Sequence, residues 1–227
     1  MNQQPQHHKI KNIFNYHKMN QGLALHTSSG ELGLSIINKD NICRCQSWDL
    51  GRDLANNLQE KIGEFLPPIL WQDLDFIAVA KGPGSFTSTR IGVVTAKTLA
   101  QQLNIPVFGI STLESLAWYH GKNLDNSSIL AVEMKANLEE VFGAIYQFIN
   151  QNTLLLSLRL DRAYKKEEWD IIIKEYQDKK EPNFHHIIAP DKLAFTTESL
   201  LEIAMLKINN NQDNSVNNWQ NLTPFYN

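Results

Sequence analysis

The order of strand-like and helix-like segments constrains the fold of this chain more than any other feature of its sequence. Three apolar stretches with strand character come first, and short connections rich in turn residues make them antiparallel neighbours. An amphipathic helix, a continuous apolar strand, a second helix and a further strand follow, which predicts an α/β lobe. The expected strands cover residues 23–27, 33–37, 42–48, 76–80 and 106–110, and the expected helices cover 53–66 and 88–103.

The second half of the chain repeats the same order. The expected strands cover residues 129–134, 140–149, 154–160 and 184–189, and the expected helices cover 166–179 and 195–208. The two halves share no visible sequence identity, so the repeat is one of topology, inferred from periodicity. Two βββαβα units side by side describe the α/β architecture of the actin-like, sugar-kinase and Hsp70-like ATPase folds, in which nucleotide lies between the halves.

Composition divides the chain into two lobes with polar extensions. Residues 1–21 are rich in Asn, Gln, His and Lys and predict a flexible N-terminal extension. We expect the first lobe over 22–118 and a smaller, degenerate second lobe over 119–227, with a polar linker near 209–221. The apolar residues that follow the linker are expected to dock on the fold.

The charge balance argues against a free-standing nucleic-acid binder. Lys and Arg number 21 against 24 Asp and Glu, for a formal net charge of -3, whereas such binders carry a basic excess that neutralises phosphates. Any tRNA contact is therefore expected through a complex. No apolar run approaches a membrane span, and the first twenty residues lack the apolar core of a signal peptide. These features predict a soluble, cytoplasmic protein.

The two cysteines of the chain, Cys43 and Cys45, lie two residues apart in an expected strand and therefore on one face of it. We expect both to be reduced thiols, because no sequence-distant cysteine exists to pair with them. The histidine doublets lie in unrelated segments, so we expect no metal site.

Residues 81–92 carry the most specific pattern in the sequence, Lys-Gly-Pro-Gly-Ser-Phe-Thr-Ser-Thr-Arg-Ile-Gly. The segment follows a buried-type strand and opens a helix, so its glycines permit a tight turn. The hydroxyl groups of Ser85, Thr87, Ser88 and Thr89 could cap the first amides of the helix, and such an end can also hold an anion. The spacing fits neither a P-loop nor a dinucleotide fingerprint. Two interpretations of this segment therefore stay open: a structural cap of the helix and a contact with phosphate.

Taken as a whole, the sequence of this segment resembles the corresponding motif of the TsaB (YeaZ) family. Members typically show an Asp-Thr-Ser first strand, Gly-Pro-Gly-Ser-Phe-Thr-Gly-x-Arg-x-Gly, and a helix that starts with Ser-Ser/Thr-Leu-Glu-Ala-Leu-Ala. The corresponding segments here are Leu-Ala-Leu-His-Thr-Ser at 23–28, residues 82–92, and Gly-Ile-Ser-Thr-Leu-Glu-Ser-Leu-Ala at 109–117. The sequence similarity covers residues 22–120 and is weaker beyond them.

The resemblance implies a non-catalytic subunit with an actin-like fold. In that family the subunit is needed to make N6-threonylcarbamoyladenosine at position 37 of tRNAs that read ANN codons. A TsaD-like subunit carries the metal and the transfer chemistry, and a TsaE-like ATPase is the third component. We therefore expect no cofactor and no catalytic residue in this chain.

The resemblance also implies pairing with the TsaD-like subunit through the helices at 53–66 and 88–103. The second helix carries two apolar strips, more than it needs to cover a sheet, and Ala96 and Ala100 are small enough to admit another helix. Self-pairing through the same face is expected when the catalytic subunit is absent. The expected interface residues are Leu54, Leu58, Ile62, Phe65, Arg90, Ile91, Val94 and Thr98, and the expected helix-entrance loop comprises Gly82, Pro83, Gly84, Ser85, Phe86 and Thr87.

An enzyme is the competing class, either an actin-fold ATPase or kinase or a metal-dependent glycopeptidase-like protein. Actin-like enzymes hold magnesium with a carboxylate on the first strand, where this chain has His26. Imidazole is a poor magnesium ligand, so we expect a buried, hydrogen-bonded histidine. The chain also lacks a His-x-x-x-His pair. Both features argue against the enzyme.

Overall fold

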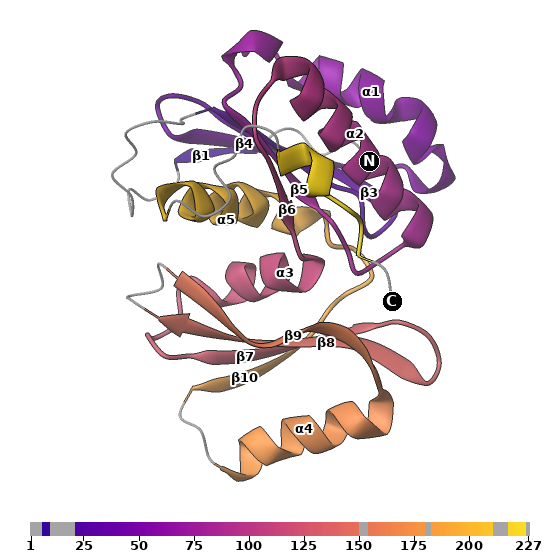
Figure 1. Ribbon diagram of the computed structural model, residues 1–227, viewed down its shortest axis with the longest axis vertical. Helices are drawn as coiled ribbons and strands as arrows, with labels where there is room; N and C mark the ends of the chain where they lie inside the picture. The colour runs from indigo at the N-terminus through magenta and orange to yellow at the C-terminus, as the bar shows by residue number, and fades with distance from the viewer. Residues whose placement is uncertain (1–5, 10–20, 150–153, 180–182, 211–217, 226–227) are drawn as a thin grey trace.

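The fold has five layers that alternate helices and sheets. The computed structural model describes residues 6–9, 21–149, 154–179, 183–210 and 218–225, and Figure 1 shows the layers stacked along the long axis. Helices α1 (Leu54–Phe65) and α2 (Phe86–Leu103) form the outermost layer, followed by a six-stranded sheet. Helices α5 (Thr197–Asn209) and α3 (Thr112–Gly121) lie between this sheet and a four-stranded sheet, and α4 (Lys166–Asp178) covers the far side.

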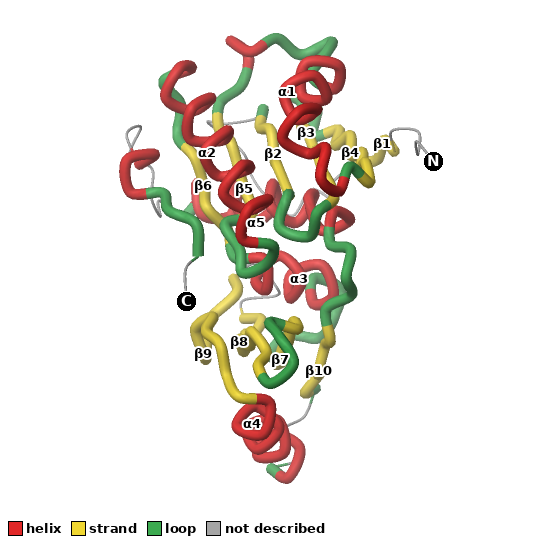
Figure 2. Tube along the Cα trace, turned by 90° about the vertical axis from the view of Figure 1, so that its right-hand side faces the viewer, coloured by secondary structure: helices red, strands yellow, loops and turns green. Residues whose placement is uncertain are grey.

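The first sheet has the strand order β1-β4-β3-β2-β5-β6, which Figure 2 shows from the side that α1 and α2 cover. Strand β2 is antiparallel to β3 and parallel to β5, and both β2 and β5 are buried along their whole length. Continuous apolar sequence forms these two strands because helices cover both faces of the sheet. The strands are β1 (Gln6–Lys9), β2 (Gly22–His26), β3 (Glu31–Ile37), β4 (Ile42–Asp49), β5 (Phe76–Ala80) and β6 (Val107–Ile110).

The second sheet repeats the topology of the first, with the order β10-β7-β8-β9. Strand β7 is antiparallel to β8 and parallel to β10, and β8 is antiparallel to β9. The predicted βββαβα repeat and the α/β class are therefore confirmed. The strands are β7 (Ile129–Lys135), β8 (Glu140–Ile149), β9 (Leu154–Lys165) and β10 (Phe184–Ile188).

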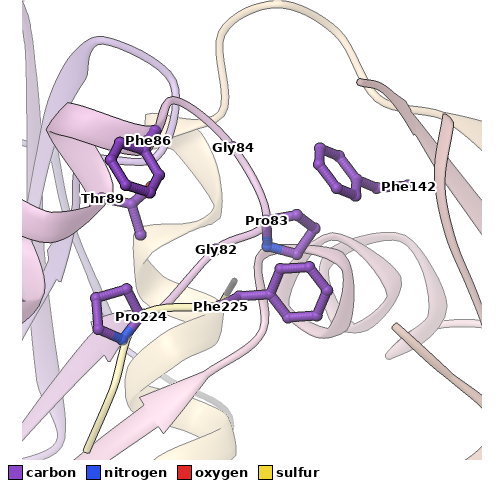
Figure 3. A pocket seen from close by; sticks show the side chains of 8 residues that line it. All are labelled: Gly82, Pro83, Gly84, Phe86, Thr89, Phe142, Pro224 and Phe225. Carbon is purple, nitrogen blue, oxygen red and sulfur yellow. The ribbon is translucent and has the colours of Figure 1, made fainter. Parts of the chain in front are cut away.

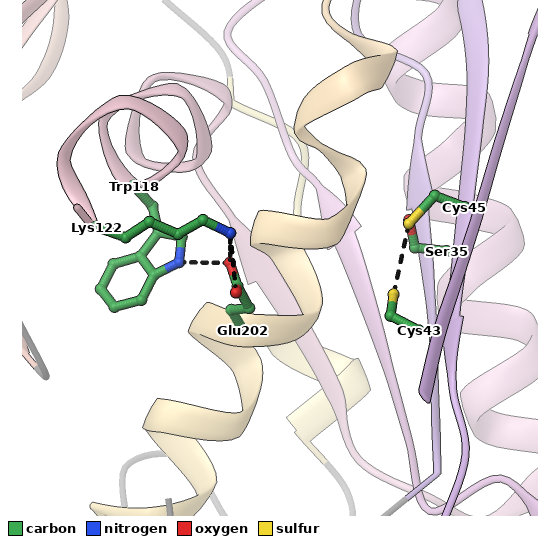
Figure 4. Close-up of polar contacts among 6 residues, drawn as sticks. All are labelled: Ser35, Cys43, Cys45, Trp118, Lys122 and Glu202. Atoms are coloured by element: carbon green, nitrogen blue, oxygen red, sulfur yellow. Dashed lines mark hydrogen bonds and ion pairs between the residues drawn. The ribbon is translucent and has the colours of Figure 1, made fainter. Parts of the chain in front are cut away.

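The middle layer joins the two sheets. Helix α5 is buried over most of its residues because the first sheet lies on one side of it and α3 on the other. The Trp118 Nε1 group of α3 donates a hydrogen bond to Oε2 of Glu202 on α5 at 2.7 Å, and Nζ of Lys122 donates to the same oxygen at 2.8 Å (Figure 4). This buried carboxylate is thus satisfied by both donors and fixes α3 to α5.

Two expectations about domain organisation differ from the structure. Within the extension expected over 1–21, residues Gln6–Lys9 form strand β1, which pairs with β4 and is an edge strand of the first sheet; residues 1–5 and 10–20 lie outside the described residues. The boundary expected at 118/119 falls inside α3, and α5 packs on the first sheet although it follows the second one. Periodicity identifies a helix but not the sheet that it covers, which is why the boundary was wrong.

The C-terminal segment docks on the first lobe, as its apolar sequence predicts. The backbone N–H of Phe225 donates to the carbonyl oxygen of Lys81 at 2.6 Å, and Leu222 packs with Trp219 against the α1 and α2 side of the first sheet. The central part of the expected linker, residues 211–217, lies outside the described residues. None of the described helices combines the length and the apolar character that crossing a bilayer requires.

Candidate functional site on the outer helices

The apolar stripe of α1 is part of the core. Leu54, Leu58, Ile62 and Phe65 keep 1%, 1%, 2% and 4% of their surface exposed, and they pack against the first sheet. The ring of Trp48 on β4 meets the ring of Phe65 edge-on at 6.0 Å between centroids. Leu54, Leu58 and Phe65 therefore belong to the core and not to the expected partner interface, because a single apolar stripe is needed to cover the sheet, whereas Ile62 also lines the groove described below.

Helix α2 carries one buried strip and one exposed strip. Thr89, Gly92, Val93, Ala96 and Ala100 face the sheet, so the two alanines cannot admit a partner helix as expected. Residues spaced by four form the outer strip, and Ile91 beside it is half-buried. The outer strip consists of Phe86, Arg90, Val94 and Thr98.

Two large apolar side chains of the outer strip face solvent. Phe86 and Val94 each keep 60% of their surface exposed. The guanidinium group of Arg90 lies 5.2 Å from the centre of the Phe86 ring, a cation–π geometry that holds the cation beside the apolar surface. Among the expected interface residues, Arg90, Val94 and Thr98 are thus the ones that a partner can reach directly.

A groove runs between α1 and α2. It encloses a cavity of about 390 Å³, and Ile62 forms part of its buried floor. The lining residues are Gln59, Ile62, Trp71, Val94, Thr95, Thr98 and Leu99. An apolar floor with polar side chains on the rim is the composition of a surface that accepts an apolar side chain from another protein.

Sequence reasoning missed the turn that closes one end of this groove. Residues Trp71–Asp73 form a short 3-10 helix after α1. Trp71 is 38% exposed and its neighbour Leu70 is 55% exposed. The signal was the apolar run Ile69, Leu70 and Trp71 directly after Pro67 and Pro68, in a stretch that must turn and is therefore expected to be polar.

The loop at the entrance of α2 packs directly against the end of β2. The N–H of Ser85 donates to the carbonyl oxygen of Ser28 at 2.7 Å, and the Oγ1 group of Thr27 donates to the carbonyl oxygen of Ser88 at 2.8 Å. A Cβ atom on Gly84 would lie 2.3 Å from the Ser28 oxygen. The loop thus needs glycine at 84 because the two backbones nearly touch.

The predicted capping by hydroxyl groups is not what the structure shows. Ser85 occupies the N-cap position of α2, but its side chain accepts no hydrogen bond from the helix amides. Its Oγ group instead donates to Oγ of Ser88 at 3.1 Å. Thr87 is exposed and Thr89 is buried, so the four hydroxyl groups do not form a common cap.

A small cavity of about 280 Å³ lies beside the entrance loop (Figure 3). The C-terminal Phe225 closes one side of it, and the ring of Phe142 on β8 meets the Phe225 ring edge-on at 6.0 Å. The cavity therefore touches both lobes and the C-terminal segment. Its lining residues are Gly82, Pro83, Gly84, Phe86, Thr89, Phe142, Pro224 and Phe225.

The cleft between the lobes, where an actin-like enzyme holds nucleotide, encloses about 300 Å³. Ser28, Lys135 and Asp191 are among its polar lining residues, and Asp191 is the one carboxylate among the described residues that line it. The described residues contain no group of three His, Cys, Asp or Glu side chains arranged to hold a metal ion.

His26 lies at the end of β2 and is fully buried, as the sequence predicts. Burial lowers its pKa from 6.5 to about 4, so the ring is neutral at pH 7. The expected hydrogen bond is missing, since neither ring nitrogen has a partner among the residues that the structure describes. A neutral, enclosed imidazole does not replace the carboxylate that would hold hydrated magnesium.

Comparisons with known proteins agree with the motifs. The family model of TsaD, described as tRNA N6-adenosine threonylcarbamoyltransferase, matches residues 51–154. The "tRNA threonylcarbamoyladenosine biosynthesis protein TsaB" of Bacillus subtilis is 33% identical over 155 residues, which cover 67% of this chain and 66% of that protein. The Escherichia coli protein of the same name is 37% identical over 75 residues, covering 33% of this chain and 32% of that protein.

The matches to these curated relatives thus span two thirds of the relative's length at most. Over nearly the whole chain, the fold is similar to that of the solved structure of YeaZ from Pseudomonas aeruginosa. The TM-score is 0.71 at 19% identity, and the match covers 92% of this chain and 100% of that chain. The shared fold confirms the predicted architecture, and the motifs and the Bacillus subtilis match confirm the resemblance: this chain belongs to the TsaB (YeaZ) family.

Proposed function

We propose that this chain is a non-catalytic subunit in the biosynthesis of threonylcarbamoyladenosine in tRNA. It pairs with a TsaD-like catalytic subunit, which modifies adenosine 37 of tRNAs that read ANN codons. The name of the Bacillus subtilis relative supports the process. The match of residues 51–154 to the TsaD family model supports a partner of related fold.

The exposed strip of α2 carries the proposal. Over residues 21–118, the exposed large apolar side chains are Ile42, Leu70, Trp71, Phe86 and Val94. All but Ile42 lie on α2 or on the turn that lines its groove. An apolar patch gathered on one helix pair is typical of a protein–protein interface. A standard interface would bury about 800 Å² of this face.

The proposal assigns the transfer chemistry to the partner. His26 is neutral and enclosed, and among the residues that the structure describes, Asp191 is the one carboxylate that lines the cleft between the lobes. These features support a degenerate cleft in which the lobes serve to hold the outer helices in place. In this scheme a TsaE-like ATPase joins the complex, and tRNA contacts this chain only through the assembly. The assembly works in the cytoplasm, and a homodimer through α2 forms when the catalytic subunit is absent.

Reconstitution tests the function. The chain, the TsaD-like subunit, the TsaE-like ATPase and unmodified tRNA are combined with threonine, bicarbonate, ATP and the enzyme that makes threonylcarbamoyl-adenylate. We expect N6-threonylcarbamoyladenosine in digested tRNA only when this chain is present. Full modification without the chain would refute the proposal.

Calorimetry of the isolated chain with ATP and Mg²⁺ distinguishes a non-catalytic subunit from an enzyme. An actin-fold ATPase or kinase would bind the nucleotide in the cleft and turn it over. We expect no turnover by the chain alone. Turnover that is lost when Asp191 is replaced by Asn would favour the enzyme, because this carboxylate lines the cleft.

A further inference from the structure

We propose that Cys43 and Cys45 form a site of reversible oxidation, at which a hydroperoxide converts the two thiols into a disulfide. The residues alternate along β4, so both side chains point to the face that α5 covers. Their Sγ atoms are 3.5 Å apart (Figure 4). These are the two cysteines of the whole chain, so no other thiol of this chain competes for either of them.

The surroundings of the two thiols assign different roles to them. The Oγ group of Ser35 on β3 donates a hydrogen bond to Sγ of Cys45 at 3.1 Å. Cys45 is half-buried, whereas Cys43 is fully buried. A peroxide molecule therefore reaches Cys45 first, and the hydroxyl group of Ser35 stabilises negative charge on that sulfur.

The pKa shifts of the two thiols support the same assignment of roles. The hydrogen bond with Cys43 lowers the pKa of the Cys45 thiol and the bond from Ser35 adds to this effect, whereas burial opposes it. The same contact with Cys45 raises the pKa of Cys43, with burial as a further cause. The carboxylates of Glu198 and Glu202 on α5 oppose thiolate formation at both sulfurs. The greater exposure of Cys45, its hydrogen bond from Ser35 and its lower pKa together assign it as the attacking thiol, and Cys43 as the resolving thiol.

The chemistry balances with hydrogen peroxide as the oxidant. The Cys45 thiolate attacks one peroxide oxygen, the O–O bond breaks, and hydroxide leaves, so that sulfenic acid forms on Cys45. The Cys43 sulfur then attacks the sulfenic sulfur and displaces hydroxide, which takes up the Cys43 proton and leaves as water. The two sulfurs are oxidised by two electrons, and the peroxide is reduced to hydroxide and water.

The strand makes this disulfide strained and easy to reduce. Alternate residues of an extended strand have Cα atoms about 6.6–6.8 Å apart, which is the upper limit for a disulfide. Closing the bond therefore requires β4 to bend between the two cysteines. Strained disulfides are readily reduced, as a reversible site requires.

The bend would act on Arg44, which lies between the cysteines and points to the opposite face of the sheet. Its Nη1 group donates to the carbonyl oxygen of Pro67 at 2.8 Å, and its Nη2 group donates to the carbonyl oxygens of Phe65 and Leu66. Its guanidinium group lies 4.6 Å from the centre of the Phe65 ring. Arg44 thus fixes the end of α1, directly before the turn that carries Trp71 into the partner groove. Because this consequence concerns partner binding, it rests on the proposed function.

The oxidation itself is tested on the full chain without any partner. Hydrogen peroxide should lower the mass of the chain by two hydrogen atoms, remove both thiols from a titration under denaturing conditions, and leave the chain monomeric on a non-reducing gel. Dithiothreitol should restore both thiols. Persistence of two titratable thiols, irreversible sulfinic acid or a disulfide-linked dimer would each overturn the proposal.

Matched variants test the assignment of roles. In Cys43→Ser, peroxide should leave a sulfenic acid on Cys45 that dimedone traps. In Cys45→Ser, dimedone should not label Cys43 at the same peroxide concentration. Equal labelling of both variants would contradict the assigned order. Circular dichroism of each variant shows whether it is folded, and peptide mass spectrometry locates the adduct.

Binding to a purified TsaD-like subunit tests the link through Arg44. We expect the oxidised chain to bind about tenfold more weakly than the reduced chain, because one charge-assisted hydrogen bond of Arg44 is worth roughly that factor. Cys43→Ser should bind equally before and after peroxide. If the reduced chain does not bind at all, the proposed function fails while the oxidation site stands. If a disulfide forms without any change in binding, the link through Arg44 is refuted.

Discussion

Replacing Val94 by glutamate should break the complex with the TsaD-like subunit and leave this chain folded. Val94 keeps 60% of its surface exposed, so a partner that covers it gains about 1–2 kcal/mol of apolar burial. An unpaired carboxylate enclosed in the interface costs several kcal/mol more. We expect a loss of about 3 kcal/mol or more in binding free energy, which is at least about a hundredfold in affinity.

The stability of the chain should hardly change, because exposed substitutions usually shift the free energy of unfolding by less than about 0.5 kcal/mol. Ile62→Glu is the contrasting variant: Ile62 is 2% exposed, so the charge enters the core and should unfold the lobe. Leu160→Glu on β9, at a residue that is 78% exposed, is the control for added surface charge. Calorimetric titration measures the binding free energy, and urea denaturation measures the free energy of unfolding. A folded Val94→Glu variant that binds within threefold of the unmodified chain would refute the reasoning.

Two further predictions concern the fold. Gly84→Ala should lower the free energy of unfolding in urea by about 1–3 kcal/mol, since its Cβ would lie 2.3 Å from the Ser28 carbonyl oxygen; unchanged stability would contradict this packing. Burial raises the pKa of the Glu133 carboxyl, but hydrogen bonds from His186 and Lys166 outweigh it and hold the pKa at about 2, below the ordinary 4.5. Stability of roughly 2–3 kcal/mol is therefore present above pH 4.5 and lost as the pH falls towards 2. Acid unfolding of Glu133→Gln should lack this step, and an unchanged acid transition would contradict the assignment.

The elements of both lobes could be predicted from the sequence because their apolar periodicities are strong. The parallel β2 and β5 pair, the stripe of α1 and the βββαβα repeat all follow from this signal. Periodicity shows that one face of a segment is buried, but it does not show which neighbour covers that face. For this reason Leu54 and Phe65 were assigned to a partner although they lie in the core.

The exposed strip of α2 was easier to predict than its groove. A helix with two apolar strips cannot bury both on one sheet, so one strip had to be exposed, and Val94 lies on it. The groove depends on Trp71, which a turn after α1 brings beside α2. Such a contact between a turn and a helix has no periodic signal. The approach of Gly84 to Ser28 was likewise visible only as a glycine that permits a turn.

Site-specific photo-crosslinking tests the central claim most directly. A benzophenone amino acid is placed at Phe86 on α2 or at Leu160 on β9, two residues that are 60% and 78% exposed on opposite lobes. With the TsaD-like subunit present, we predict a crosslinked heterodimer from position 86 and none from position 160. Crosslinking from position 160 alone would show that the partner binds the second lobe, and would contradict the account.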